Sequence, residues 1–83
     1  MNLQYENLLL ELVNNDFNLD KYEDYCLVDF KCYTFEISPF KLNEYDCINI
    51  KVVKTKTKEY VVEIETPCAY SAYNYLTEFS CYW

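Results

Sequence analysis

The chain has 83 residues, with 14 acidic side chains against seven lysines, a net charge of −7, and no His, Arg or Gly. At this length we expect one compact domain over residues 1–83, because the 52% apolar content is too high for a disordered chain. The missing residue types exclude phosphate-cradling glycine loops, His-based catalytic triads and bidentate Arg recognition of phosphate. The negative charge would repel nucleic acid, so direct DNA or RNA binding is not expected.

The first predicted element is an amphipathic helix over residues 2–14, with Asn2 as its N-cap. Its apolar residues recur at helical spacing and form one face: Tyr5, Leu8, Leu9, Leu12 and Val13. Asn14 and Asn15 end it, because Asn tolerates the left-handed C-cap conformation in a chain without Gly.

Residues 16–25 are predicted to form an acidic connector. Asp16, Asn18 and Asp20 copy the opening of a calcium loop. The match then fails, because Lys21 stands where the loop needs Gly and Leu27 where it needs a bidentate Glu. A metal site is therefore not expected here.

The next stretch alternates in the manner of a strand from Cys26 to Ile37. The apolar phase moves from even to odd positions along it, which predicts a bulge near residues 33–34. Ser38 and Pro39 are expected to stop this strand, leaving residues 40–46 as a loop or a short edge segment.

A β-hairpin is predicted next, because Ile48, Ile50 and Val52 alternate with polar residues and the alternation resumes at Tyr60 after a lysine-rich turn. Pairing residue 52 with residue 62 keeps the apolar faces together, and it places residue 51, a lysine, opposite residue 63, a glutamate. Without Gly, the turn is expected to be longer than two residues.

Thr66 and Pro67 suggest the N-cap and first position of a second helix that runs to about residue 80. The predicted fold is thus α+β, in the order α-β-β-β-α. Two layers are expected, a three-stranded antiparallel sheet with the N-terminal and C-terminal helices packed on one face.

The five cysteines form no Cys-x-x-Cys pair and, in a chain without His, are interpreted as small buried hydrophobic residues rather than as a zinc site: Cys26, Cys32, Cys47, Cys68 and Cys81. No cofactor is expected. The sequence opens without a signal-peptide pattern and has no apolar run long enough to cross a membrane, so a cytoplasmic protein that does not bind membranes is expected.

Aromatic residues make up 19% of the chain and include ten tyrosines. One group is predicted to face the core: Tyr5, Phe30, Tyr60, Tyr73 and Phe79. A second group is predicted to face solvent, where aromatic residues favour protein interfaces: Tyr22, Tyr25, Tyr45, Tyr70, Tyr75, Tyr82 and Trp83. An AT-rich coding bias explains the tyrosines equally well.

The opening Met1–Asn2 helix that closes near residues 15–17, the hairpin with residues 59–62 and the helix after it resemble the small acidic anti-CRISPR proteins of phages, in particular Cas9 inhibitors. The chain departs from them in having five cysteines and no strongly acidic tail. The resemblance implies a phage protein, in the cytoplasm of the host cell, that mimics DNA and blocks the duplex-binding groove of its target.

We therefore hypothesise a non-enzymatic inhibitor that binds a CRISPR effector or another basic nuclease through an acidic, Tyr-bearing surface. Its candidate partner-binding residues are Asp20, Tyr22, Glu23, Asp24, Tyr25, Glu63 and Glu65. No catalytic residue is proposed, because carboxylates on an open sheet face lack the enclosure that tunes pKa values. The alternatives are an immunity protein or antitoxin that caps a basic nuclease, and a small homodimeric structural protein.

Overall fold

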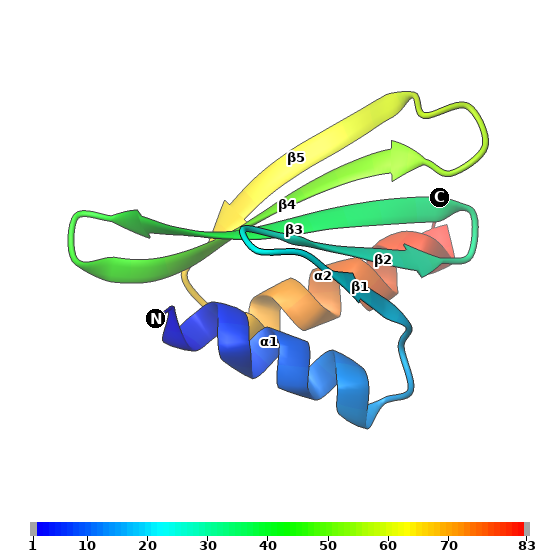
Figure 1. Cartoon of the computed structure of the whole chain (residues 1–83). Coiled ribbons are helices and arrows are strands. Elements are labelled where there is room, and N and C mark those ends of the chain that lie inside the picture. Colours follow the sequence, from blue (N-terminus) through cyan, green and yellow to red (C-terminus); the bar gives the residue numbers. More distant parts are fainter. Residues whose placement is uncertain (1, 83) are drawn as a thin grey trace.

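The computed structural model describes residues 2–82. Its elements, in chain order, are α1 (Leu3–Asn14), β1 (Leu19–Lys21), β2 (Cys26–Phe30), β3 (Tyr33–Leu42), β4 (Tyr45–Lys54), β5 (Tyr60–Thr66) and α2 (Ala69–Tyr82). The strands form one antiparallel sheet in the order β1-β2-β3-β4-β5, and both helices pack on the same face of it (Figure 1). The predicted α+β class and the two flanking helices are confirmed, but the sheet has five strands and not three.

The predicted strand over residues 26–37 is in fact two strands joined by a tight turn at Lys31 and Cys32. Phe30 pairs with Tyr33 across this turn, so the change of apolar phase comes from a hairpin and not from a bulge. Lys31 takes the left-handed conformation, with φ of 58°. Gly usually occupies such positions, and its absence hid the turn from sequence reasoning.

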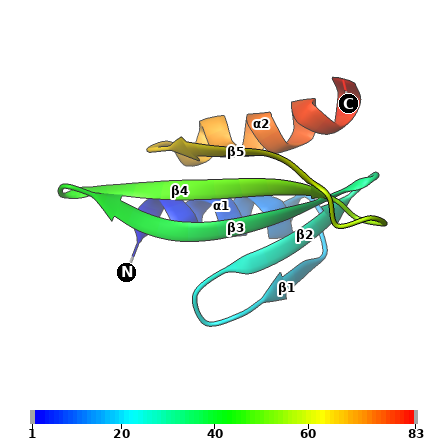
Figure 2. The same ribbon diagram turned by 90° about the horizontal axis from the view of Figure 1, so that it is seen from above.

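The prediction that Ser38 and Pro39 stop a strand is wrong, because β3 continues to Leu42. β2 accompanies β3 only as far as Ile37, whereas β4 pairs with β3 along its whole length. Pro39 therefore lies where β3 has become an edge strand, and there a missing N–H is tolerated. Residues 40–46, expected to be a loop or a short edge segment, form the end of a β3–β4 ribbon that projects beyond the sheet (Figure 2).

Two further predictions near α1 need correction. The acidic connector contains the short edge strand β1, which pairs with β2. The left-handed residue after α1 is Asp16, with φ of 65°, whereas Asn15 at the C-cap has φ of −105°. The expected helix and its Asn2 N-cap are confirmed, although Val13 is 55% exposed.

The β4–β5 hairpin has the predicted register, with Val52 opposite Val62 and Lys51 opposite Glu63. The register shifts beyond Val52, and Tyr60 is 59% exposed although it was predicted to face the core. The second helix begins at Ala69 rather than at residues 66–67, which belong to the end of β5 and the connection after it.

The core lies between the sheet and the helices. Its fully buried side chains come from α1, from the inner face of the sheet and from α2, and the largest are Phe35, Leu8, Leu12, Ile37, Ile48, Ile50 and Leu76. Tyr75 packs against this core and was wrongly predicted to face solvent, while residues 82–83 lie outside the described side chains. Cys26 and Cys47 are buried as predicted, Cys32 and Cys68 are exposed, and the side chain of residue 81 is not described.

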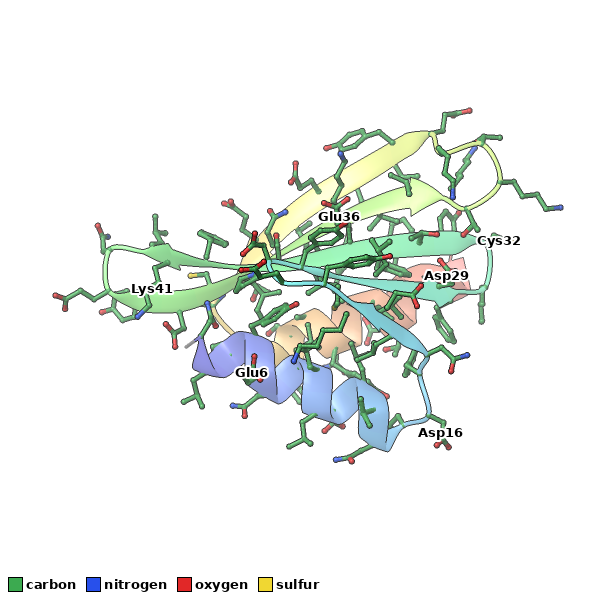
Figure 3. The ribbon with its side chains drawn as sticks, viewed as in Figure 1. Glu6, Asp16, Asp29, Cys32, Glu36 and Lys41 are labelled. Carbon is green, nitrogen blue, oxygen red and sulfur yellow. The ribbon has the colours of Figure 1, made fainter. Side chains whose placement is uncertain are left out.

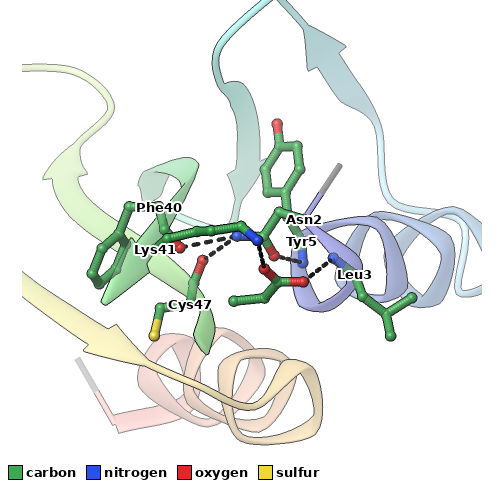
Figure 4. Close-up of polar contacts among 7 residues, drawn as sticks. Asn2, Leu3, Tyr5, Phe40, Lys41 and Cys47 are labelled. Carbon is green, nitrogen blue, oxygen red and sulfur yellow. Dashed lines mark hydrogen bonds and ion pairs between the residues drawn. The ribbon is translucent and has the colours of Figure 1, made fainter. Parts of the chain in front are cut away.

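The N-terminus of α1 is tied to the β3–β4 ribbon by a polar network (Figure 4). The Asn2 side chain accepts a hydrogen bond from the Tyr5 amide at 2.9 Å and donates two, to the carbonyl oxygens of Phe40 and Cys47, at 3.0 Å each. Asp46 accepts a 2.7 Å bond from the Leu3 amide and pairs with Lys41 at 3.2 Å. These contacts hold the pKa of the Asp46 carboxyl below its usual value.

Candidate functional site

The face of the sheet opposite the helices is open to solvent, and we call it the outer face. Strand register places one residue from each strand in a row across it: Asp20, Leu27, Glu36, Lys51 and Glu63. Figure 3 shows Glu36 on the far side of the sheet from Glu6 of α1. Four strand spacings separate the ends of the row, which is about 19 Å.

Carboxylates dominate this outer face. We call the following exposed residues the acidic face: Asp20, Asp29, Glu36, Glu63 and Glu65. Lys51 stands between Glu36 and Glu63 in the register. Lys51 is thus opposite two carboxylates, and the five acidic side chains still leave this face with an excess of negative charge, which a cationic partner would complement.

Two carboxylates of the acidic face are held in place by neutral donors. The Asn49 side chain donates from Nδ2 to Glu63 Oε2 at 2.8 Å, and the Thr34 hydroxyl donates to Asp29 Oδ1 at 2.6 Å. Thr34 Oγ1 also lies 2.9 Å from Thr55 Oγ1, which links β3 to the β4–β5 turn. These bonds orient the two carboxylates without neutralising their charge.

The structure divides the seven predicted partner-binding residues between two places. Asp20, Glu63 and Glu65 lie on the acidic face, although β1 and β5 are opposite edges of the sheet. The other four form the turn between β1 and β2, at residues 22–25. Sequence reasoning missed Asp29 and Glu36; their alternation with the buried Val28 and Phe35 was the available signal.

The 22–25 turn presents two carboxylates and two aromatic rings. The rings of Tyr22 and Tyr25 stack with centroids 4.8 Å apart and planes inclined by 14°, and the Tyr22 amide donates to the Tyr25 carbonyl at 2.8 Å. Tyr22 is 48% exposed, and Glu23 and Asp24 at the tip are also exposed. The stacked pair lowers the conformational freedom of the turn, which favours its use as a rigid contact.

The β3–β4 ribbon adds an apolar end to the outer face. Leu42 and Tyr45 pair across the ribbon and are 59% and 71% exposed. Together with Phe40 they line a depression of about 420 Å³ that Glu65 and Pro67 border. An apolar patch beside charged residues is the usual anatomy of a protein interface. The expectation of a loop or a short edge segment over residues 40–46 did not bring these side chains together into a patch.

The thiols differ in environment. Burial raises the pKa of the Cys26 thiol and also that of the neighbouring Tyr5 hydroxyl. Cys68 lies exposed just before α2. Hydrogen bonds to its sulfur, above all the one from the backbone N–H of Ser71, lower the pKa of the Cys68 thiol.

We therefore expect iodoacetamide at neutral pH to modify Cys68 about tenfold or more faster than Cys26, because the thiolate is the reactive form. Peptide mass spectrometry after a time course measures both rates. Cys68→Ser should remove the modification at this position, keep that at the exposed Cys32, and leave the fold intact. Equal rates at the two thiols would contradict the difference in burial.

Within the described part of the chain, no three potential metal ligands gather into a group. Neither α1 nor α2, as far as the structure describes them, is long and apolar enough to span a membrane. Comparison with protein-family models, curated proteins and solved structures gave no match.

Proposed function

We propose that this chain is a non-enzymatic, phage-encoded inhibitor that binds a basic nucleic-acid-handling protein, such as a CRISPR effector, and blocks its access to DNA. The observation that carries the proposal is the acidic face, where carboxylates from β1, β2, β3 and β5 lie on one uncovered surface. A groove that binds phosphates offers the complementary charge.

The neighbouring features give the surface specificity as well as charge. The Tyr22 and Tyr25 rings, and the apolar ribbon end with Leu42 and Tyr45, supply the aromatic and aliphatic contacts that concentrate binding energy at interfaces. The carboxylates speed the encounter, and steering of this kind raises association rates by about 10- to 1000-fold at low salt. Charge and apolar contact thus act at different stages of binding.

The proposal is tested with a guide-loaded Cas9-type effector and a labelled PAM-containing duplex, followed by fluorescence anisotropy. We expect the wild-type chain to displace the duplex. The variant Glu36→Gln/Glu63→Gln/Glu65→Gln should be weaker by about tenfold or more, because it removes charge from the acidic face alone.

A matched control is available on the helices. Glu6→Gln/Glu11→Gln/Glu78→Gln removes the same amount of charge from α1 and α2, outside the acidic face. It should inhibit as well as the wild type. Equal loss in both triple variants would reduce the effect to net charge, and full inhibition by the first variant would exclude the acidic face as the binding surface.

A further inference from the structure

The end of the sheet opposite the 22–25 turn is basic. The β2–β3 and β4–β5 turns lie side by side there (Figure 1), joined by a 3.0 Å hydrogen bond from the Thr55 amide to the Cys32 carbonyl. Sequence reasoning located the lysines of the β4–β5 turn, and the fold adds Lys31 from the β2–β3 turn. Positive charge therefore gathers at one end of a molecule whose net charge is −7.

A depression of about 390 Å³ lies between these two turns, and we call it the lysine pocket. It is lined by Lys31, Cys32, Tyr33, Lys54, Thr55, Lys56 and Thr57. Lys54 is 3.8 Å from Glu59, but both side chains are more than half exposed, and such a pair holds its lysine only weakly. The volume is within the range of about 300–1000 Å³ that is typical of ligand pockets.

The 22–25 turn has the chemistry that fits the lysine pocket. Glu23 and Asp24 supply two exposed carboxylates for the lysines, and Tyr22 supplies an exposed ring for the apolar lining. The 22–25 turn and the β2–β3 turn stand at opposite ends of β2 (Figure 2), which is about 16 Å long for its five residues, and the β2–β3 turn lines the lysine pocket. A molecule cannot place this turn into its own pocket, so any contact between the two would join separate molecules.

We propose that the lysine pocket of one copy receives the 22–25 turn of a second copy, so that the chain associates with itself. Charge complementarity selects this contact. The acidic faces of two copies would repel each other, whereas the lysine pocket of one copy attracts the carboxylates of the other. The acidic face stays uncovered. A target that binds the 22–25 turn therefore competes with self-association, and a target that uses only the acidic face does not.

Charge reversal tests this contact without any knowledge of the target. In the variant Glu23→Lys/Asp24→Lys, a basic turn meets the basic pocket. In the variant Lys54→Glu/Lys56→Glu, the acidic turn meets an acidic pocket. Each variant should therefore be monomeric by sedimentation equilibrium at about 20 mM salt. The wild type should exceed its monomer mass of 10.1 kDa as its concentration rises. A mixture of the two variants should associate again, because both contacts are then complementary.

Net charge alone predicts a different pattern. Glu23→Lys/Asp24→Lys lowers the overall repulsion, so association through unspecific contacts would increase in that variant. The control Lys21→Glu/Lys51→Glu has the same charge as the pocket variant but leaves the lysine pocket unchanged, and it should still associate. Circular dichroism checks that every variant folds.

A monomeric wild type at millimolar concentration and low salt would overturn the proposal. So would a mixture of the two reversed variants that fails to associate, which would leave an acidic segment of another protein as the occupant of the pocket. Self-association and inhibition are tested separately. The variant Glu36→Gln/Glu63→Gln/Glu65→Gln is expected to lose inhibition but to associate like the wild type.

Discussion

Replacing Phe35 by Ala should lower the free energy of unfolding by about 3–5 kcal/mol. The side chain is fully buried near the start of β3, and its ring meets that of Phe79 edge-on at a centroid distance of 6.1 Å. A domain of 83 residues has a total stability of about 4–12 kcal/mol, so the variant should lose at least about a quarter of its stability. Urea denaturation followed by circular dichroism measures the loss.

Tyr45→Ala provides the matched control for Phe35. It also removes an aromatic ring from a strand, but its side chain is 71% exposed, so the loss should stay below about 0.5 kcal/mol. A small loss for Phe35→Ala, or equal losses for the two variants, would contradict the position of the core between sheet and helices.

Asn2→Ala should cost about 2–4 kcal/mol, although the residue stands at the start of the chain. The N-cap bond to the Tyr5 amide contributes about 1 kcal/mol, and the bonds to the carbonyls of Phe40 and Cys47 about 0.5–1.5 kcal/mol each. Because these carbonyls belong to the β3–β4 ribbon, the loss should also loosen the ribbon from α1. Urea denaturation measures the total.

Asn2→Ser separates the two contributions. Serine keeps an acceptor for the helix cap but is too short to reach both carbonyls, so about 1 kcal/mol of the loss should return. Full recovery with serine would show that the two bonds to the ribbon contribute nothing. No recovery would show that the cap itself is dispensable.

The parts of the fold that could be predicted are those in which local patterns agree. In the β4–β5 hairpin, apolar alternation and opposite charges select the same register, and Val52 pairs with Val62 as expected. In α1, the apolar spacing and Asn2 agree on the start of the helix. Each of these signals depends on residues close together in the sequence.

The errors arose where a rule depends on position in the sheet. Pro39 is a strand breaker in a central strand, but it lies where β3 is an edge, and no local signal shows this. The turn at Lys31 and Cys32 lacks the Gly that normally marks a tight hairpin. Three strands were predicted instead of five because this turn and the short edge strand β1 were both missed, whereas the error at Pro39 only shortened β3.

The candidate site shows the same division. Asp20, Glu63 and Glu65 were selected from local charge, but that they share one face follows only from the register of all five strands. The same register brings in Glu36 from the middle of the sheet. The lysine pocket likewise needs the β2–β3 turn, which sequence reasoning did not detect.

The central claim is that the acidic face binds a basic nucleic-acid-handling protein. The most direct measurement is a pull-down from bacterial lysate with the tagged chain, at low and at moderate salt, with mass spectrometry of the retained proteins. The account predicts that the wild type and the control Glu6→Gln/Glu11→Gln/Glu78→Gln retain a CRISPR effector or another nuclease at low salt. Moderate salt should release this protein, and the variant Glu36→Gln/Glu63→Gln/Glu65→Gln should not retain it. Equal retention by that variant, or the absence of any nucleic-acid-binding protein, would contradict it.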